Sequence, residues 1–157
     1  MLRLIPPPVH RVMLRLAYRL RRRALRLFKP DLASVSIILT NQQDQLLLVR
    51  HSYGPQGWAL PGGGLGRKED PWWGIRREIR EELQCEVQAL DLIGTFEETL
   101  SGARHTAYLF AARPLDEPRA DGRELLEARW FERETVAGLD LTRVTRERLL
   151  AVDALEQ

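Results

Sequence analysis

The chain has 157 residues, which suits one domain and is enough to bury a substantial core. Apolar residues make up 44% and charged residues 29% of the sequence, a composition typical of globular proteins rather than disordered chains. The single cysteine, Cys85, excludes an intramolecular disulfide. No apolar run approaches the roughly 20 residues that span a bilayer, and arginines interrupt the N-terminal segment too often for a secretory signal. We therefore expect a cytoplasmic protein.

Charge is distributed unevenly along the chain. Residues 1–29 contain nine of the 24 basic side chains and none of the 22 acidic ones, so the remainder carries 15 basic and 22 acidic side chains. Between residues 9 and 28, apolar side chains recur at helical spacing with arginines between them, and Pro30 ends this pattern. The sequence therefore predicts a basic helical arm over residues 1–30, followed by a single domain over residues 31–157.

Three partners suit a basic arm of this kind. Its apolar stripe and arginines suit an anionic membrane surface, and its charge suits the phosphates of RNA. It is also suited to dock on the acidic body of its own chain or of a second subunit, which includes the possibility of a homodimer. The plainest interpretation is a docked or solvated accessory helix.

The segments after the arm have the composition of strands. Residues 33–40 and 45–50 are rich in valine, isoleucine and leucine, and the polar residues 41–44 between them predict a turn. We interpret this pair as a β-hairpin. A loop with turn residues follows, and then a short apolar segment that leads into three glycines.

A glycine-rich loop and a carboxylate-rich helix form the centre of the sequence. Gly62, Gly63 and Gly64 let the backbone approach a ligand closely, so we predict that they bind substrate. Asp70 is suited to cap a helix whose first residue is Pro71. Four apolar residues recur every three or four positions and predict the buried face of this helix: Trp72, Ile75, Ile79 and Leu83.

The rest of the chain continues the mixture of strands and helices. Residues 85–99 and 104–113 are predicted as strands joined by a turn, residues 127–131 as a short strand, and residues 142–155 as a final helix. There is no internal repeat and no sign of a second domain. This order of elements predicts an α/β or α+β sandwich.

Three glutamates stand on one face of the central helix. Glu78, Glu81 and Glu82 are spaced i, i+3 and i+4, which places them within about 6 Å of one another. Such anions repel unless a cation lies among them, and Mg²⁺ commonly joins carboxylates with water and substrate phosphates. The spacing therefore predicts a metal site for phosphate chemistry, with Arg77 placed to orient one carboxylate. A solvated face of paired charges is the ordinary alternative for such a helix.

The spacing of these residues resembles the signature of a known family. Gly63 is followed by five residues and then Glu69, seven further residues follow, and residues 77–85 read REIREELQC. This pattern resembles the Nudix box, G-x5-E-x7-R-E-U-x-E-E-x-G-U, in which U is apolar. The preceding residues, WALPGGG, are also similar to the usual approach to the box. So many matches at fixed intervals form a far stronger signal than a lone glycine motif.

The resemblance implies a Nudix-type α/β/α sandwich with a mixed β-sheet, from about residue 32 to the end of the chain. It implies hydrolysis of the pyrophosphate of a nucleoside diphosphate linked to a moiety X, with Mg²⁺ or Mn²⁺ as the cofactor. Glu78, Glu81 and Glu82 match the metal-binding glutamates, and Arg77 matches the arginine that orients them. Small nucleotides such as ADP-ribose, nucleoside triphosphates and nucleotide sugars all fit, because specificity in this family comes from loops outside the box.

One position of the box departs from the pattern. The family's last glycine is replaced by Gln84. A glycine after a helix usually takes the left-handed conformation, and glutamine in that conformation costs on the order of 1 kcal/mol. Because Gln84 matches no metal ligand, we expect a slightly altered helix end and an intact metal site.

Several residues outside the box are further candidates. Glu98 ends a predicted strand and is the favoured general base for the attacking water, with a solvated strand end as the alternative. His105 begins the next strand and is a candidate contact for a substrate phosphate, with a surface histidine as the alternative. Tyr53, beside His51, is suited to stack on a base, whereas Trp58 is expected in the core.

Aromatic and acidic residues elsewhere suggest additional contacts. Trp73 is expected to be exposed and to face a partner or a substrate. Glu127 lies in a late strand where the family sometimes places a glutamate near the metals.

Two other functions remain open. The arm favours an RNA 5′-end pyrophosphohydrolase, and a non-catalytic module that senses a nucleotide is disfavoured by the complete glutamate set.

Overall fold

The structure is a computed structural model that describes residues 9, 13, 17, 31–100 and 102–153. The predicted basic arm and its partners therefore lie outside the described residues, except that Val9, Met13 and Ala17 are helical and exposed. The end of the predicted final helix, beyond Asp153, also lies outside them. Among the described helices, none combines the length and the apolar character needed to cross a membrane.

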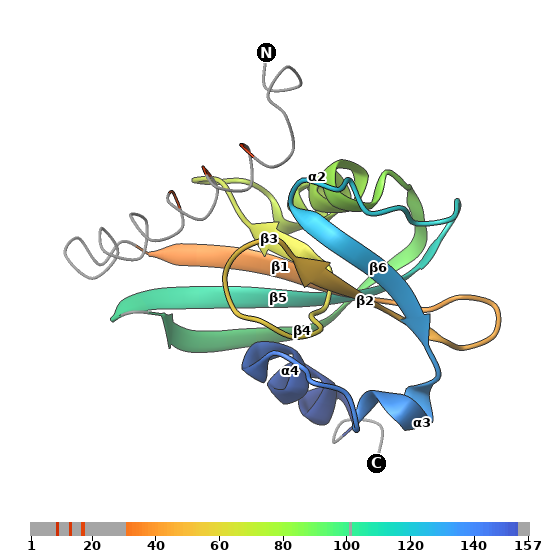
Figure 1. Cartoon of the computed structure of the whole chain (residues 1–157). Helices are drawn as coiled ribbons and strands as arrows, with labels where there is room; N and C mark the ends of the chain where they lie inside the picture. The colour runs from red at the N-terminus through yellow and green to blue at the C-terminus, as the bar shows by residue number, and fades with distance from the viewer. Residues whose placement is uncertain (1–8, 10–12, 14–16, 18–30, 101, 154–157) are drawn as a thin grey trace.

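Four strands form a mixed sheet in the order β3-β1-β5-β4 (Figure 1). The central strand β1 (Leu32–Leu39) pairs antiparallel with β3 (Gly62–Gly64) and parallel with β5 (Ala103–Pro114). Strand β4 (Val87–Leu100) pairs antiparallel with β5 at the opposite edge. The strands predicted over residues 85–99 and 104–113 are thus confirmed, whereas no strand was predicted at the glycine triplet.

Strand β1 is buried on both faces. Ile37 and Leu39 are fully buried in one core cluster, whereas Ile38 belongs to the cluster on the other side. A strand covered on both sides carries a continuous apolar run instead of alternating polar residues, which explains the composition of residues 33–40.

A second, two-stranded sheet is formed by β2 (Leu46–His51) and β6 (Leu125–Phe131), which pair antiparallel. The predicted hairpin of the first two strands is therefore wrong, because only Thr40 and Leu46 form a bridge between them. The predicted turn is present, since the Asn41 side chain accepts the Gln45 N–H at 2.9 Å. The strands separate after the turn because β3 and β5 already occupy both edges of β1.

Helices cover the sheets on two sides (Figure 1). Helix α2 (Pro71–Leu83) lies on one side, and α3 (Arg133–Val136) and α4 (Arg143–Asp153) lie on the other. Each side has its own apolar cluster, with Ile79 and Phe110 in the first and Trp58 and Leu109 in the second. The arrangement is the α/β/α sandwich with a mixed sheet that was predicted.

Helix α2 begins as the sequence predicts. The Asp70 side chain accepts the N–H of Trp72 at 2.9 Å and of Trp73 at 3.2 Å, and Pro71 is the first helical residue. The place predicted for Trp72 in the buried stripe is wrong, because this side chain is 39% exposed. It lies in the first turn, where its ring meets Phe110 edge to face at 5.0 Å between ring centroids. Trp73 is exposed, as expected.

The end of α2 differs from the expectation. The helix ends at Leu83, and Gln84 adopts the left-handed conformation with φ 55° and ψ 31°, so the backbone keeps the shape a glycine would take. Two main-chain bonds hold this end in place. The Arg119 N–H donates to Leu83 O at 2.7 Å, and the Asp121 N–H donates to Glu82 O at 3.0 Å. The helix end is therefore strained rather than altered.

Restoring glycine at this position is expected to stabilise the protein. Gln84→Gly should raise the free energy of unfolding by about 1 kcal/mol, because glycine takes the left-handed conformation without the Cβ clash. Turnover should not change. Urea denaturation checks this, with Gln84→Ala as the control, since alanine keeps the Cβ and should bring no gain. If the glycine variant were no more stable than the alanine variant, the inference that the Gln84 backbone is strained would be wrong.

Candidate active site

The glycine triplet lies against the carboxylate face of α2. The Gly62 N–H points to Glu82 Oε2 at 3.4 Å. A Cβ placed on Gly63 would lie 2.5 Å from Glu78 Cδ and equally close to Oε1. The missing side chain therefore makes room for the Glu78 carboxylate. Binding of substrate by Gly62, Gly63 and Gly64 stays a prediction.

Filling that space is expected to impair the site without unfolding the protein. Gly63→Ala should push the Glu78 carboxylate aside and lower turnover by about 10- to 100-fold, because displaced catalytic groups cost that much. Steady-state kinetics check the loss, and circular dichroism checks the fold. Gly138→Ala is the matched control, because its Cβ would meet only Thr135 O at an ordinary 3.5 Å. Equal turnover in the two variants would refute this role of Gly63.

Arg77 connects the glycine loop to the helix. Its Nε and Nη2 donate to the two carboxylate oxygens of Glu69 at 2.8 and 3.0 Å, and Nη2 also donates to Gly64 O at 3.2 Å. Nη1 donates to Glu78 at 2.9 Å and to Glu81 at 3.2 Å. These five bonds match the five N–H groups of a guanidinium. The predicted orienting role of Arg77 thus has a geometric basis.

The same network shifts the acid–base behaviour of both partners. Hydrogen bonds from Arg77, followed by one from the Gly66 N–H, lower the pKa of Glu69 to about 2. The hydrogen bonds and charges of Glu69 and Glu78 raise the pKa of Arg77 above its already high value. The loop is therefore held by a pair that is fully ionised at neutral pH.

Two of the three predicted metal-binding glutamates are buried. Glu78 is 8% exposed and Glu82 is 3% exposed, because they share the inner face of α2 with Ile75 and Ile79. Burial raises the pKa of Glu78 despite Arg77, and burial together with the charges of Glu78 and Glu124 raises the pKa of Glu82 well above its usual range. Arg77 offsets part of the charge of Glu78, whereas no arginine or lysine of the described residues pairs with Glu82.

Glu81 lies differently from the other two. Its side chain is 62% exposed and bonds only to Arg77 through Oε2. Across the described residues, no three acidic, histidine or cysteine side chains stand in an arrangement ready to hold a metal ion. The donor set nevertheless fits a hard divalent cation. All the donors are carboxylate oxygens. A cation beside Glu78 and Glu82 would offset the cost of their burial and, with it, the repulsion from neighbouring carboxylates, the two causes that raise both pKa values.

A loop that was not singled out in the sequence brings further carboxylates to this pair. Asp121 accepts the N–H groups of Arg123 and Glu124 at 3.0 Å and of Leu125 at 2.9 Å, which shapes the turn before β6. The charges of both Asp121 and Glu124 act on Glu82. Glu124 was missed because no spacing links it to the box, and only an Asp-Gly turn marks the loop.

The glutamate that was proposed from the late strand lies elsewhere. Glu127 is part-exposed and pairs with Arg50 at 3.6 Å and with Arg129 at 3.2 Å. These ion pairs hold Glu127 among the arginines of the β2–β6 sheet.

The residues around Tyr53 lie beside the carboxylates. The Tyr53 O–H donates to Glu124 Oε2 at 3.0 Å, and His51 Nδ1 is 4.0 Å from Glu82 Oε1. Burial lowers the pKa of His51, whereas burial and Glu124 raise the pKa of Tyr53, so the phenol keeps its proton. Trp58 is buried in the core, as expected.

Glu98 and His105 are not brought to this cluster. Glu98 binds Arg148 of α4, and His105 Nδ1 is 3.8 Å from Glu98 Oε1. The Arg148 guanidinium also lies over the Phe96 ring at 3.9 Å. Strands β1 and β5 separate β4 from β3, which corresponds to about 14 Å across the sheet. The geometry thus gives no support to Glu98 as the general base or to His105 as a phosphate contact.

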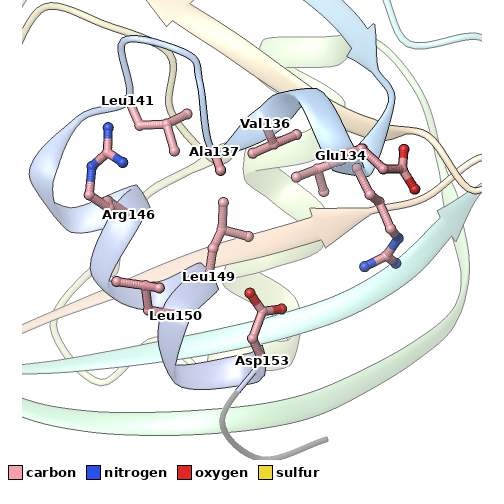
Figure 2. Close-up of a pocket in the computed structure, with 10 residues that line it drawn as sticks. Glu134, Val136, Ala137, Leu141, Arg146, Leu149, Leu150 and Asp153 are labelled. Carbon is pink, nitrogen blue, oxygen red and sulfur yellow. The ribbon is translucent and has the colours of Figure 1, made fainter.

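A cavity of about 390 Å³ lies on the same side as α4 (Figure 2). It lies between α3 and α4, is open to solvent, and is lined by apolar side chains such as Val136, Leu141 and Leu149 together with Arg146 and Asp153. It shares no residue with the carboxylate cluster, so we do not assign this cavity to the candidate active site.

Comparison with known proteins identifies the family. A sequence model of the NUDIX domain matches residues 30–151. This match covers well over half of the chain, and it contains the glycine triplet, Arg77 and the three glutamates described above. The chain belongs to the Nudix family.

Curated relatives match over the central part of the chain. An RNA pyrophosphohydrolase of Cellvibrio japonicus is 38% identical over 66 residues, which make up 42% of this chain and 37% of that protein. A human diphosphoinositol polyphosphate phosphohydrolase is 34% identical over 71 residues, which make up 45% of this chain and 39% of that protein. The matched segments thus span well under half of the length of these relatives.

Solved structures share the fold over most of the chain. A MutT protein from Methanosarcina mazei superimposes with a TM-score of 0.69 and 24% identity, covering 83% of this chain and 98% of that one. The NUDIX domain of Shewanella oneidensis NrtR, solved in complex with ADP ribose, superimposes with a TM-score of 0.68 and 18% identity, covering 83% and 89%. At these identities the likeness establishes the fold alone.

Proposed function

We propose that this chain is a Mg²⁺-dependent hydrolase that cleaves the pyrophosphate of a nucleoside diphosphate linked to a moiety X. Suitable substrates are small nucleotides such as ADP-ribose, a nucleoside triphosphate or a nucleotide sugar. The observation that carries the proposal is the buried pair Glu78 and Glu82 beside a glycine strand, in which only Glu78 has an arginine partner. Membership of the Nudix family supports the same reaction.

Each residue of the cluster has a distinct role in this reaction. Glu78, Glu81 and Glu82 would hold Mg²⁺ or Mn²⁺, which when bound polarises a phosphoryl oxygen and activates a water. Arg77 keeps Glu78 and Glu81 oriented and ties them to the loop. Glu124 replaces Glu98 as the carboxylate outside the box that accepts a proton from the attacking water, because its charge acts on both Glu78 and Glu82.

A substrate screen tests this proposal. Purified protein is incubated with ADP-ribose, nucleoside triphosphates, nucleotide sugars, dinucleoside polyphosphates and a diphosphoinositol polyphosphate, each with Mg²⁺ or with EDTA. We expect turnover of at least one nucleotide with Mg²⁺ and none with EDTA. Glu82→Gln serves as the inactive reference for each compound. Turnover that EDTA leaves unchanged would refute the metal-dependent reaction.

Two further outcomes would redirect the assignment. Tight binding of ADP-ribose without any turnover would indicate a nucleotide sensor instead of an enzyme. RNA is the second candidate substrate, favoured by the match to the Cellvibrio japonicus RNA pyrophosphohydrolase. A 5′-triphosphorylated RNA therefore belongs in the screen. Release of pyrophosphate from this RNA, with an affinity that falls steeply as salt rises, would favour that function.

A further inference from the structure

We propose that Tyr53 is a positioning residue of this site, whose phenol O–H holds the Glu124 carboxylate beside Glu78 and Glu82 and thereby strengthens metal binding. The inference rests on the proposed function. The O–H donates to Glu124 Oε2 at 3.0 Å, and both side chains are half-buried. The two residues come from segments 71 positions apart in the chain.

The backbone brings these two segments together independently of the phenol. The Ser52 N–H donates to Glu124 O at 2.8 Å, and Ser52 Oγ donates to Arg123 O at 2.7 Å. The ladder of β2 and β6 reaches His51 and Leu125, with a register shift between Arg50 and His51. Loss of the phenol oxygen should therefore leave the main chain in place and change only the carboxylate.

The Glu124 carboxylate needs a hydrogen-bond donor to fix its position because the neighbouring carboxylates of Glu78 and Glu82 are also negative. It lies within electrostatic reach of Glu78 and Glu82, and both of these carboxylates repel it. Without a donor, rotation towards solvent would relieve this repulsion. A neutral phenol fixes the carboxylate and leaves its negative charge available, whereas a lysine or arginine would offset the charge that a cation requires.

The same logic separates Tyr53 from Arg77. Arg77 carries a positive charge and binds Glu69, Glu78 and Glu81 on the more exposed side of the helix. Tyr53 acts from the loop that follows β2 and adds no charge. The carboxylates of the site are thus held from two directions. The Arg77 guanidinium holds them on the more exposed side of the helix, and the neutral Tyr53 phenol holds Glu124 on the side of the second sheet.

Metal affinity measured on Tyr53→Phe tests the inference. Binding of Mn²⁺ is followed by electron paramagnetic resonance, without substrate, so the readout does not depend on turnover. We expect Mn²⁺ to bind about 10- to 100-fold more weakly than to wild type, the usual loss when a partner of a metal ligand is removed. The KM for the nucleotide should stay the same at saturating Mg²⁺. Tyr108→Phe makes the same chemical change in a residue that packs against the core from β5, and it should bind Mn²⁺ like wild type.

A double-mutant cycle shows whether Tyr53 acts through Glu124. If it does, Tyr53→Phe has no further effect on Mn²⁺ affinity once Glu124→Ala is present. Additive losses would overturn the inference, and so would wild-type Mn²⁺ affinity in Tyr53→Phe. A KM that rises in Tyr53→Leu but not in Tyr53→Phe, with Mn²⁺ affinity unchanged in both, would show instead that the ring stacks on a base. Failure of wild type to hydrolyse any compound would refute the proposed function, whereas the Mn²⁺ measurements would still decide the role of Tyr53.

Discussion

Glu82→Gln is expected to make the metal-free protein more stable while it lowers turnover. Glu82 is 3% exposed, and the hydrogen bond that its carboxylate accepts from the Gly62 N–H is long at 3.4 Å. Relief of this buried charge should raise the free energy of unfolding by about 1 kcal/mol, the lower end of the cost of an unsatisfied buried group. For a chain of this size that corresponds to a melting temperature about 2–4 °C higher.

The gain in stability should depend on pH in a defined direction. Burial raises the pKa of Glu82 in the folded protein above its value in the unfolded chain, so folding takes up a proton. Wild-type stability should therefore fall as pH rises from about 4.5, the usual glutamate value, towards the raised pKa. The glutamine variant lacks this loss. The two proteins should be most alike below pH 4.5 and differ most above the raised pKa of Glu82.

Turnover should change in the opposite direction. Removal of one buried carboxylate that we propose to bind the metal should lower kcat/KM by about 10³-fold, which corresponds to about 4 kcal/mol of transition-state stabilisation. Addition of Mg²⁺ should raise the melting temperature of wild type but not of the variant.

Thermal denaturation and kinetics on the same preparations check both effects. The control is Glu86→Gln, because Glu86 is exposed and pairs with Arg80 on the outer side of the helix. It should match wild type in both measurements. A metal-free Glu82→Gln protein that is less stable than wild type would show that Glu82 has a structural partner, and the argument for a cation site would fail.

Glu98→Ala is expected to destabilise the protein strongly and to leave turnover of the folded molecules unchanged. Its partner Arg148 has a side chain only 7% exposed, between the sheet and α4. Removal of the carboxylate leaves a buried guanidinium with its charge uncompensated, which typically costs about 3–5 kcal/mol. The melting temperature should fall by about 6 °C or more.

Urea denaturation and kcat at a temperature where the variant is folded separate the two roles considered for Glu98. The matched control is Glu97→Ala, because Glu97 is the neighbouring strand residue, is exposed, and bonds to Thr106 at 2.9 Å. The control should lose little stability. A Glu98→Ala protein of nearly normal stability but with turnover reduced 100-fold would restore Glu98 as the general base and contradict its assignment to the packing of α4.

Local patterns predicted the parts of the site that lie within one stretch of chain. The cap at Asp70 and the contact of Arg77 with Glu78 follow from spacing on one loop and one helix, whereas the Glu69–Arg77 pair was not predicted. The identity of the additional carboxylate could not be predicted in this way. Glu98 and Glu124 both follow or precede strands, and only strand order decides which of them reaches α2. That order depends on β1 having both edges occupied, which no local pattern reveals.

The Gln84 expectation failed for a related reason. Local propensity favours a change of backbone at a non-glycine residue, but bonds from Arg119 and Asp121 hold the end of the helix. Tertiary contacts therefore override the local preference, and the residue bears the strain. Trp72 shows the reverse case, because its helical phase is correct while its place in the first turn leaves much of the indole uncovered.

The saturation of Arg77 bears on the order in which ligands arrive. All five N–H groups of this guanidinium donate to protein oxygens, so none is left to bind an incoming phosphate chain. A polyphosphate that approached the helix alone would meet Glu78, Glu82 and Glu124 as like charges. Entry of substrate and entry of a divalent ion are thus coupled by electrostatics, and a nucleotide already chelated to its ion is the form best suited to enter.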